Sequence, residues 1–379
     1  MKKESPLYYA DYLELDKILT AQHPKSASLL TNPSHDETLF IIVHQAFELW
    51  FLQIIHELKS VIDILAKAGI DDNSDEMGKI VQRLDRVVRI IKLMNSQFEI
   101  LETMQPLDFL EFRGLINPSS GFQSKQFRLI EAMLGLQINN RHMPEHYKNT
   151  GTHHGGFSQE DYDEISEAEN SLTLLQGLKK WLNRMPFFDK DLWSHYQPIY
   201  PYNRIGDNKF ASDYFNIYDQ LQRELRDNIL LIENINENAK QKAVEGYINS
   251  IDTFKTLFIE KGTDTFSANE LITAMFIMLY RQSPMLRLPF AFINSLVEID
   301  ELLSTWRYKH YLIVRKMIGS KVGTGGSIGA AYLLGALQKN NVFSDITLLA
   351  TYFLERDKLP VLPKELKETL NFRQIEHKA

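Results

Sequence analysis

Apolar residues recur at steps of three and four along most of the chain, which is the spacing that one face of an α-helix requires. In the N-terminal third, this pattern predicts helices over residues 8–19, 34–68, 77–104, 107–115 and 122–136. Farther along, it predicts helices over residues 159–184, 211–260, 267–280, 290–318, 341–356 and 364–371. Because neither β alternation nor an internal repeat accompanies these helices, the predicted fold class is all-α.

The polar segments between the helices indicate how the chain is organised. A polar stretch with two prolines follows the first short helix, so residues 1–22 are expected to form a separate N-terminal helix. The remaining residues, 23–379, are expected to form a single large helical domain with a real core. Within that domain, residues 139–269 are a charged and variable helical excursion.

The stretch from Ser304 to Gly329 combines a helix end with a glycine-rich loop. One face of the helix carries Leu303, Trp306, His310, Ile313 and Met317. Gly319 is expected to end the helix, and the loop behind it contains Thr324. The loop matches neither the Walker nor the dinucleotide-binding pattern, because it follows a helix and its glycines are misplaced. His310 is therefore either a hydrogen-bonded core residue or a ligand, and its spacing leaves both interpretations open.

A second histidine lies on an aromatic helix face near the N-terminus. This stripe contains, at spacings of four, three and four residues, Phe40, His44, Phe47 and Phe51. Ser34 and Glu37 precede it with the spacing of a capping box, which predicts that the helix begins there. For His44 the alternatives are again packing in the core and a role in a site.

Two further groups of residues allow a functional and a structural interpretation. Arg113 lies between apolar neighbours just before a Ser/Gly turn, so it is either a surface charge or a clamp for an anion. Four histidines gather at positions 142, 146, 153 and 154, which suggests either a metal site or a loop. Pro144 breaks any helix that would hold His142 and His146 together, and this favours the loop.

Composition excludes several classes of protein. The 42 Lys and Arg residues against 49 Asp and Glu residues include no long basic run, so neither nucleic acid nor an anionic membrane is an expected partner. No apolar run of membrane-spanning length and no signal-peptide core are apparent, so the expected location is the cytoplasm. The absence of cysteine excludes disulfides, thiolate chemistry and covalently attached haem. Any haem would be bound non-covalently, with histidine as the leading candidate for its ligand.

Several long motifs resemble one family, the tryptophan 2,3-dioxygenases. They are YADYLELDKILTAQ at 9–22, FIIVHQAFELWFLQIIHEL at 40–58, ILETMQPLDFLEFRGLINPSSGFQSKQFRLIE at 100–131 and WRYKHYLIVRKMIGSKVGTGGSIG at 306–329. The resemblance covers about residues 8–137 and 276–333, and these motifs are long and occur in the same order. The middle of the chain is similar only in being helical.

The resemblance implies a fold, a reaction and an assembly. The fold is a core helical bundle that encloses haem b, which is ferrous in the active form. The reaction inserts both atoms of O2 across the C2–C3 bond of the indole of L-tryptophan and gives N-formylkynurenine. The assembly is a homotetramer in which the N-terminal helix of one subunit reaches the site of a neighbour.

The resemblance also implies roles for individual residues. His310 corresponds to the proximal haem ligand, and His44 to the distal histidine that meets the indole N–H. Arg113 corresponds to the residue that pairs with the substrate carboxylate, and Thr324 to a loop residue near the substrate ammonium and carboxylate. The remaining matches are Phe40 against the indole, Ser120 and Trp306 beside the haem, and Tyr9, Tyr12 and Leu13 in the N-terminal helix.

Two departures from the family pattern and two alternative functions stay open. Phe109 and Phe47 stand where some relatives have tyrosine, and the loss of a hydroxyl at position 109 gives Arg113 and Thr324 more weight. One alternative is a haem oxygenase or hydroxylase for another indole or a phenol. The other is a protein without enzymatic activity, either a haem-binding sensor or a cofactor-free helical scaffold. A sensor has no need of a substrate clamp made by Arg113 and Thr324.

Overall fold

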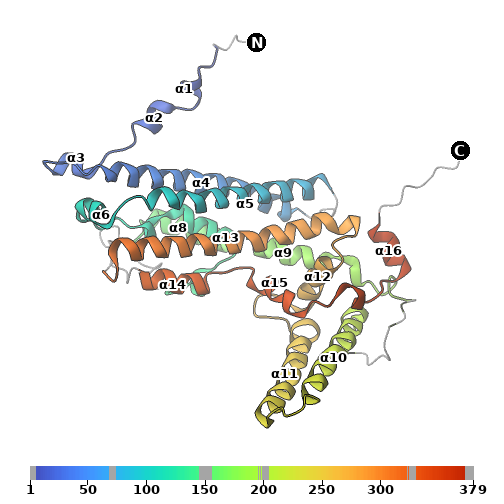
Figure 1. Ribbon diagram of the computed structural model, residues 1–379. Helices are drawn as coiled ribbons and strands as arrows, with labels where there is room; N and C mark the ends of the chain where they lie inside the picture. Colours follow the sequence, from blue (N-terminus) through green and yellow to red (C-terminus); the bar gives the residue numbers. More distant parts are fainter. Residues whose placement is uncertain are drawn as a thin grey trace. The chain divides into compact units, whose positions relative to one another are not determined.

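The computed structural model describes residues 6–67, 74–144, 156–194, 196, 198, 205–321, 323 and 330–371. Throughout these ranges the regular elements are helices, and the β pairing between two described residues is the isolated bridge of Gly262 and Ser267. The predicted all-α class is therefore confirmed (Figure 1).

The chain divides into two compact units. The first unit consists of residues 1–59, 86–173 and 301–341, and the second of residues 60–85, 174–300 and 342–379. Three long helices contribute residues to both, namely α4 (Asp36–Ala66), α5 (Asp75–Leu101) and α13 (Arg287–Ile318). The predicted boundary near residue 22 stays a prediction.

The shorter helices belong to one unit each. The first unit contains α1 (Tyr9–Tyr12), α2 (Leu15–Leu19), α3 (Lys25–Leu29), α6 (Pro106–Arg113), α7 (Lys125–Leu134), α8 (Gln159–Asn170) and α14 (Ala330–Lys339). The second unit contains α9 (Leu174–Arg184), α10 (Lys209–Leu230), α11 (Glu237–Lys255), α12 (Ala268–Leu279), α15 (Ser344–Leu348) and α16 (Lys364–Leu370).

In the first unit, α5 is bonded to both α4 and α13. The side-chain amide of Gln97 donates to the backbone oxygen of Val43 on α4 at 2.9 Å. That of Asn95 donates to the backbone oxygen of Leu302 on α13 at 3.1 Å, and Lys309 of α13 donates to the Asn95 carbonyl at 2.9 Å. Because these bonds join backbone to side chain across helices, they fix the relative position of the faces that carry the predicted site residues.

Helix α13 ends where the sequence predicts. Its last residue is Ile318, and Gly319 follows with φ of +61°, the left-handed conformation that glycine adopts most readily. The Gly319 N–H donates to the Arg315 carbonyl at 3.0 Å. The apolar face of this helix is also as predicted, because Leu303, Ile313 and Met317 are buried.

The capping box predicted at the start of α4 is not formed. The Glu37 carboxylate instead accepts the backbone N–H groups of Lys25 and Ser26, at 2.7 and 2.8 Å. The Ser34 N–H donates to the Ser26 hydroxyl at 3.0 Å, and the Ser34 hydroxyl has no partner among the described residues. Glu37 therefore caps the short helix α3, which the sequence pattern did not predict.

Two predicted helices are interrupted, whereas the amphipathic helices predicted over 159–184 are confirmed as α8 and α9. The segment 8–19 forms α1 and α2, separated by Glu14 with φ of +49°. The single helix predicted over 211–260 is wrong. It is a hairpin of α10 and α11 followed by a π-helical turn, Thr256–Glu260, and Asn234 with φ of +62° lies in the connection (Figure 1). Helix α14 was also not predicted.

Helix α4 corrects the expectation that no segment is long and apolar enough to span a membrane. In the described part of the chain, residues 36–65 meet both criteria. Core helices meet the same criteria, and α4 buries Val43, Phe47 and Phe51 within the protein. It also carries Glu48 and Glu57, charges that are costly in a bilayer. A membrane protein is therefore not indicated.

Two glycines of the second unit give opposite predictions for stability. A Cβ at Gly262, where φ is +90°, would collide with the backbone at Phe266 and Ser267, so Gly262→Ala should destabilise by at least about 1–3 kcal/mol. Gly246 lies within α11 with open space around it, so Gly246→Ala should stabilise by about 0.5–1 kcal/mol. Urea unfolding measures both, and equal effects would contradict the assigned backbone conformations.

Candidate functional site

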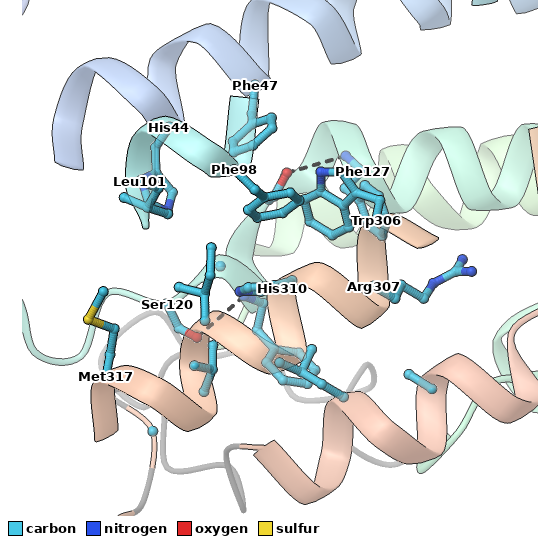
Figure 2. A pocket seen from close by; sticks show the side chains of 18 of the residues that line it. His44, Phe47, Phe98, Leu101, Ser120, Phe127, Trp306, Arg307, His310 and Met317 are labelled. Carbon is cyan, nitrogen blue, oxygen red and sulfur yellow. Dashed lines mark hydrogen bonds between the residues drawn. The ribbon is translucent and has the colours of Figure 1, made fainter. Parts of the chain in front are cut away.

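The first unit encloses a cavity of about 250 Å³. This is far larger than the ~10–15 Å³ that one water requires, so the cavity is sized for an organic molecule. Its walls come from α4, α5, α6, α7, α13 and α14, together with the short turn η2 (Gly121–Gln123). Figure 2 shows His44 on α4 and His310 on α13 in the walls of this one pocket.

His44 presents a hydrogen-bond acceptor to the cavity. Its Nδ1 lies 2.7 Å from the Phe40 carbonyl oxygen, which can only accept, so Nδ1 carries the proton. Burial lowers the pKa of His44, although the Phe40 carbonyl and the Glu48 charge act in the opposite direction. A neutral ring protonated at Nδ1 leaves Nε2 as an acceptor for a ligand N–H.

His310 is also neutral near pH 7. Burial lowers its pKa to about 4, and the neighbouring charges of His44 and Arg128 add to the effect. The Nδ1 atom is buried and has no hydrogen-bond partner in the described part of the protein. A neutral imidazole is the form that binds a metal, so the state of the ring suits a ligand.

Aromatic rings surround each histidine. Phe40 lies 4.1 Å from the His44 ring and also contacts Phe109 and Phe112, at 5.7 and 5.5 Å between ring centres. His310 lies 5.3 Å from Trp306 and 6.4 Å from Phe98. These rings exclude water and offer flat apolar surfaces to a ligand.

Arg113 and Ser120 line the same cavity. Arg113 is the last residue of α6, one turn after Phe109, and the helix that carries it begins with Pro106 and a capping box between Gln105 and Asp108. The Ser120 hydroxyl accepts the Phe122 N–H at 3.3 Å, which fixes the turn beside the pocket. The structure therefore brings together the predicted residues Phe40, His44, Arg113, Ser120, Trp306 and His310.

Other predicted site residues are not among the described residues that line the cavity. Thr324 is outside the described residues, as are His146, His153 and His154. Tyr9 and Tyr12 of α1 are 70% and 69% exposed, and neither they nor Leu13 line the cavity of their own chain. Within the described ranges, no group of three metal-binding side chains occurs.

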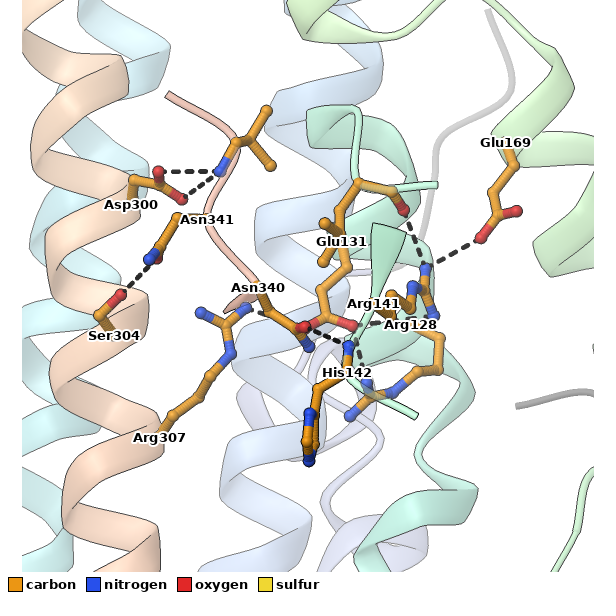
Figure 3. Close-up of polar contacts among 12 residues, drawn as sticks. Arg128, Glu131, Arg141, His142, Glu169, Asp300, Ser304, Arg307, Asn340 and Asn341 are labelled. Carbon is orange, nitrogen blue, oxygen red and sulfur yellow. Dashed lines mark hydrogen bonds and ion pairs between the residues drawn. The ribbon is translucent and has the colours of Figure 1, made fainter. Parts of the chain in front are cut away.

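One polar group in the cavity wall was not predicted from the sequence. It consists of Arg128, Glu131 and Arg307, joined by ion pairs of 2.7 Å (Arg128–Glu131) and 2.8 Å (Arg307–Glu131) (Figure 3). Arg128 and Glu131 are three residues apart on α7, which is a spacing typical of a helical ion pair. Arg307 lies 176 positions from Glu131, so no local pattern could indicate its contact with the carboxylate.

Comparison with known proteins identifies the family. A sequence profile described as tryptophan 2,3-dioxygenase matches residues 1–353. The chain belongs to the tryptophan 2,3-dioxygenase family. It is 38% identical to the tryptophan 2,3-dioxygenase of Bdellovibrio bacteriovorus, over 98% of this chain and 99% of the relative. The corresponding enzyme of Alteromonas mediterranea is 35% identical over 98% and 99%, and that of Dictyostelium discoideum 37% over 97% and 88%.

Membership of the tryptophan 2,3-dioxygenase family implies a haem cofactor, and the cavity wall contains the kinds of groups that hold one. A haem needs a metal ligand, apolar surfaces and donors for its carboxylates. His310 offers a neutral imidazole, and the rings of Phe98, Phe127 and Trp306 are apolar surfaces. Two buried donors, Trp306 Nε1 and Arg307 Nη1, have no partner within the described ranges, and both residues belong to the cavity wall.

Glu131 should make the stability of the protein depend on pH in the acid range. Burial raises the pKa of Glu131, but the charges of Arg128, Arg141 and Arg307 outweigh it and lower the pKa to about 2, from a usual 4.5. The contribution of this lowered pKa to the free energy of unfolding is fully present above pH 4.5 and is lost as the pH falls toward 2. Glu131→Gln should remove this contribution, whose slope reaches about 1.4 kcal/mol per pH unit.

The measurement is denaturant unfolding at several values from pH 6 to pH 3, and Glu169→Gln is the matched control. Burial raises the pKa of Glu169, so this carboxyl binds its proton earlier in the folded protein and favours folding as the pH falls. Glu169→Gln should therefore steepen the loss of stability, whereas Glu131→Gln should flatten it. Identical slopes for the two variants would contradict the assignment.

Proposed function

We propose that this chain is a haem-dependent dioxygenase that cleaves the C2–C3 bond of the indole of L-tryptophan with O2 and forms N-formyl-L-kynurenine. The observation that carries the proposal is the placement of two neutral imidazoles and one guanidinium group in a single aromatic cavity. One imidazole suits a metal, the other an indole N–H, and the guanidinium group a carboxylate.

His310 is the proposed axial ligand of haem b. It projects from a helix whose apolar face is buried, and its ring is held between Trp306 and Phe98. When bound, a ferrous haem would supply the oxygen chemistry. Trp306 and Ser120 border the proposed cofactor position, and Trp306 Nε1 is a buried donor that can serve a haem carboxylate.

His44 orients the substrate. Because Nδ1 donates to the Phe40 carbonyl, Nε2 is free to accept the indole N–H. Phe40 and Phe109 supply the surfaces against which a flat indole packs. The proposed role of His44 is to position the indole and not obligatory proton transfer, since a neutral ring that accepts a hydrogen bond need not remove the proton.

Arg113 pairs with the carboxylate of the amino acid. A planar guanidinium group binds a carboxylate through two parallel hydrogen bonds, which fixes both distance and orientation. The substrate is thereby held at two points, its carboxylate at Arg113 and its ring N–H at His44. Thr324 is the proposed third contact, near the ammonium and carboxylate groups.

The proposed assembly is a homotetramer in which Tyr9, Tyr12 and Leu13 complete the site of a neighbouring subunit. Their short helix is too small to be stable alone, and its tyrosines are exposed. On α4, Ile42, Leu49 and Leu52 are 48%, 53% and 57% exposed and offer apolar surface for a subunit contact. The proposed location is the cytoplasm.

Turnover of tryptophan with labelled O2 tests the reaction. The product should contain two labelled oxygen atoms, and one labelled atom would instead identify a hydroxylase for an indole or a phenol.

His310→Ala should lose most of the bound haem and its Soret band, because the ligand is removed. His56→Ala, an exposed position on α4, is the control and should keep both. A haem spectrum unaffected by His310→Ala would refute the axial role.

Replacing Arg113 separates binding of the carboxylate from binding of the ring. Arg113→Lys substitutes a point charge for a planar fork, so KM for tryptophan should rise by the equivalent of roughly 1.5–3 kcal/mol. Tryptamine, which has no carboxylate, should distinguish poorly between the two proteins. The control is Arg356→Lys, at an exposed position of the second unit. An unchanged KM for tryptophan would exclude Arg113 as the carboxylate partner.

Removing residues 1–20 tests the shared site. The truncated protein should bind tryptophan more weakly and dissociate more readily, whereas its haem spectrum should stay the same. Light scattering and tryptophan titration measure these two properties, and Tyr9→Ser with Tyr12→Ser should reproduce the loss of affinity without deletion. A truncated tetramer with full affinity would show that the N-terminal segment serves no neighbouring site.

A further inference from the structure

A buried carboxylate connects three segments of the first unit. Glu131 on α7 is 1% exposed. One oxygen accepts from Arg307 Nη2 on α13 at 2.8 Å, and the other from Arg128 Nη1 at 2.7 Å (Figure 3). Arg141, which follows α7 in the chain, approaches the second oxygen to 3.8 Å. All three guanidinium groups are themselves buried, so each has a fixed direction.

The charges of this cluster require Glu131. Arg141 has a second anionic partner, since it donates to Glu169 at 3.0 Å. The three guanidinium groups and the two carboxylates leave one net positive charge in the cluster. Without the Glu131 carboxylate, the buried Arg128 and Arg307 would lose their ion pairs with it, and removing one partner of a buried ion pair is costly.

The cluster also contacts the ring stack beside His310. The guanidinium groups of Arg128 and Arg307 lie 4.9 and 5.9 Å from the centre of the Phe127 ring. Phe127 in turn stacks on Trp306 at 4.8 Å, and Trp306 lies 5.3 Å from His310. Arg307 directly follows Trp306 and precedes His310 by three residues, so its ion pair holds the turn of α13 that carries both rings.

We propose that Glu131 is a positioning residue for His310, acting through Arg307 and the Phe127–Trp306 stack. The proposal rests on the proposed role of His310 as axial ligand. Glu131 touches neither the substrate nor the iron in this role. Its ion pair with Arg307 sets the rotation of α13 beside the cavity. Its ion pair with Arg128 holds that guanidinium group near the Phe127 ring.

Two arginines provide a matched pair for the test. Arg307 and Arg141 are both buried and both interact with Glu131, but only Arg307 belongs to the cavity wall. In the haem-loaded full-length protein, Arg307→Lys should shift the iron–imidazole stretching band in the resonance Raman spectrum. It should also weaken haem binding by about tenfold, equivalent to about 1.4 kcal/mol. Arg141→Lys should lower the melting temperature and leave the band in place.

A double variant separates positioning from stability. Glu131→Gln alone leaves the buried arginines without their shared counter-ion and should lower stability. Glu131→Gln combined with Arg307→Met removes one charge of each sign, so the cluster again has one net positive charge and stability should largely recover. Positioning predicts that the Raman band stays displaced in the double variant. Recovery of the wild-type band together with stability would show that the role is only structural.

The outcomes also distinguish this inference from the axial assignment. If His310→Ala keeps the wild-type band, the axial assignment itself fails. If His310→Ala abolishes the band while Arg307→Lys leaves it and the haem affinity unchanged, only the positioning role of Glu131 is overturned. Arg307→Lys can lose its haem and keep the far-ultraviolet circular dichroism of the folded protein, while Arg141→Lys keeps its haem. That result counts as the expected weakening of haem binding. Equal band shifts in both arginine variants would overturn the inference.

Discussion

Desolvation of two imidazoles is the constraint on which the rest of the cavity depends. Burial favours the neutral form of histidine, and it lowers the pKa of both His44 and His310. A neutral His310 suits a metal ion, and a neutral His44 that donates to the Phe40 carbonyl presents an acceptor. If the aromatic walls admitted water, the pKa of each imidazole would approach its usual value near 6.5. The two rings would then no longer be held in the neutral form that these roles require.

Keeping the cavity dry requires helices that are fixed without the help of water. The bonds of α5 to α4 and α13 serve this purpose on one side, since each joins a side chain to a backbone group of another helix. On the other side Glu131 holds α7 and α13 by ion pairs within the wall. Charged groups are tolerated there because each carboxylate oxygen faces a guanidinium group, whereas an unmatched charge would be costly.

The sequence predicted those features that depend on local spacing. The periodicity around His310 and the glycine at position 319 located the end of α13, and the stripe through His44 located α4. Breaks inside polar stretches were missed, because leucine, isoleucine and glutamate residues around Asn234 are compatible with a continuous helix. The capping box failed because Glu37 bonds Lys25 and Ser26, a tertiary choice that spacing does not specify. The contact between Glu131 and Arg307 could not be predicted from the sequence for the same reason.

The distribution of polar groups around the cavity supports the proposal that one pocket holds two different ligands. The acceptor of His44 and the guanidinium group of Arg113 belong to α4 and α6, where Phe40 and Phe109 provide apolar surface. Arg307 and Trp306 belong to α13, beside His310, and there buried donors lack partners among the described residues. A substrate with an N–H and a carboxylate matches the first set. A flat macrocycle with a metal and carboxylates matches the second set, so the chemistry of each set selects its own ligand.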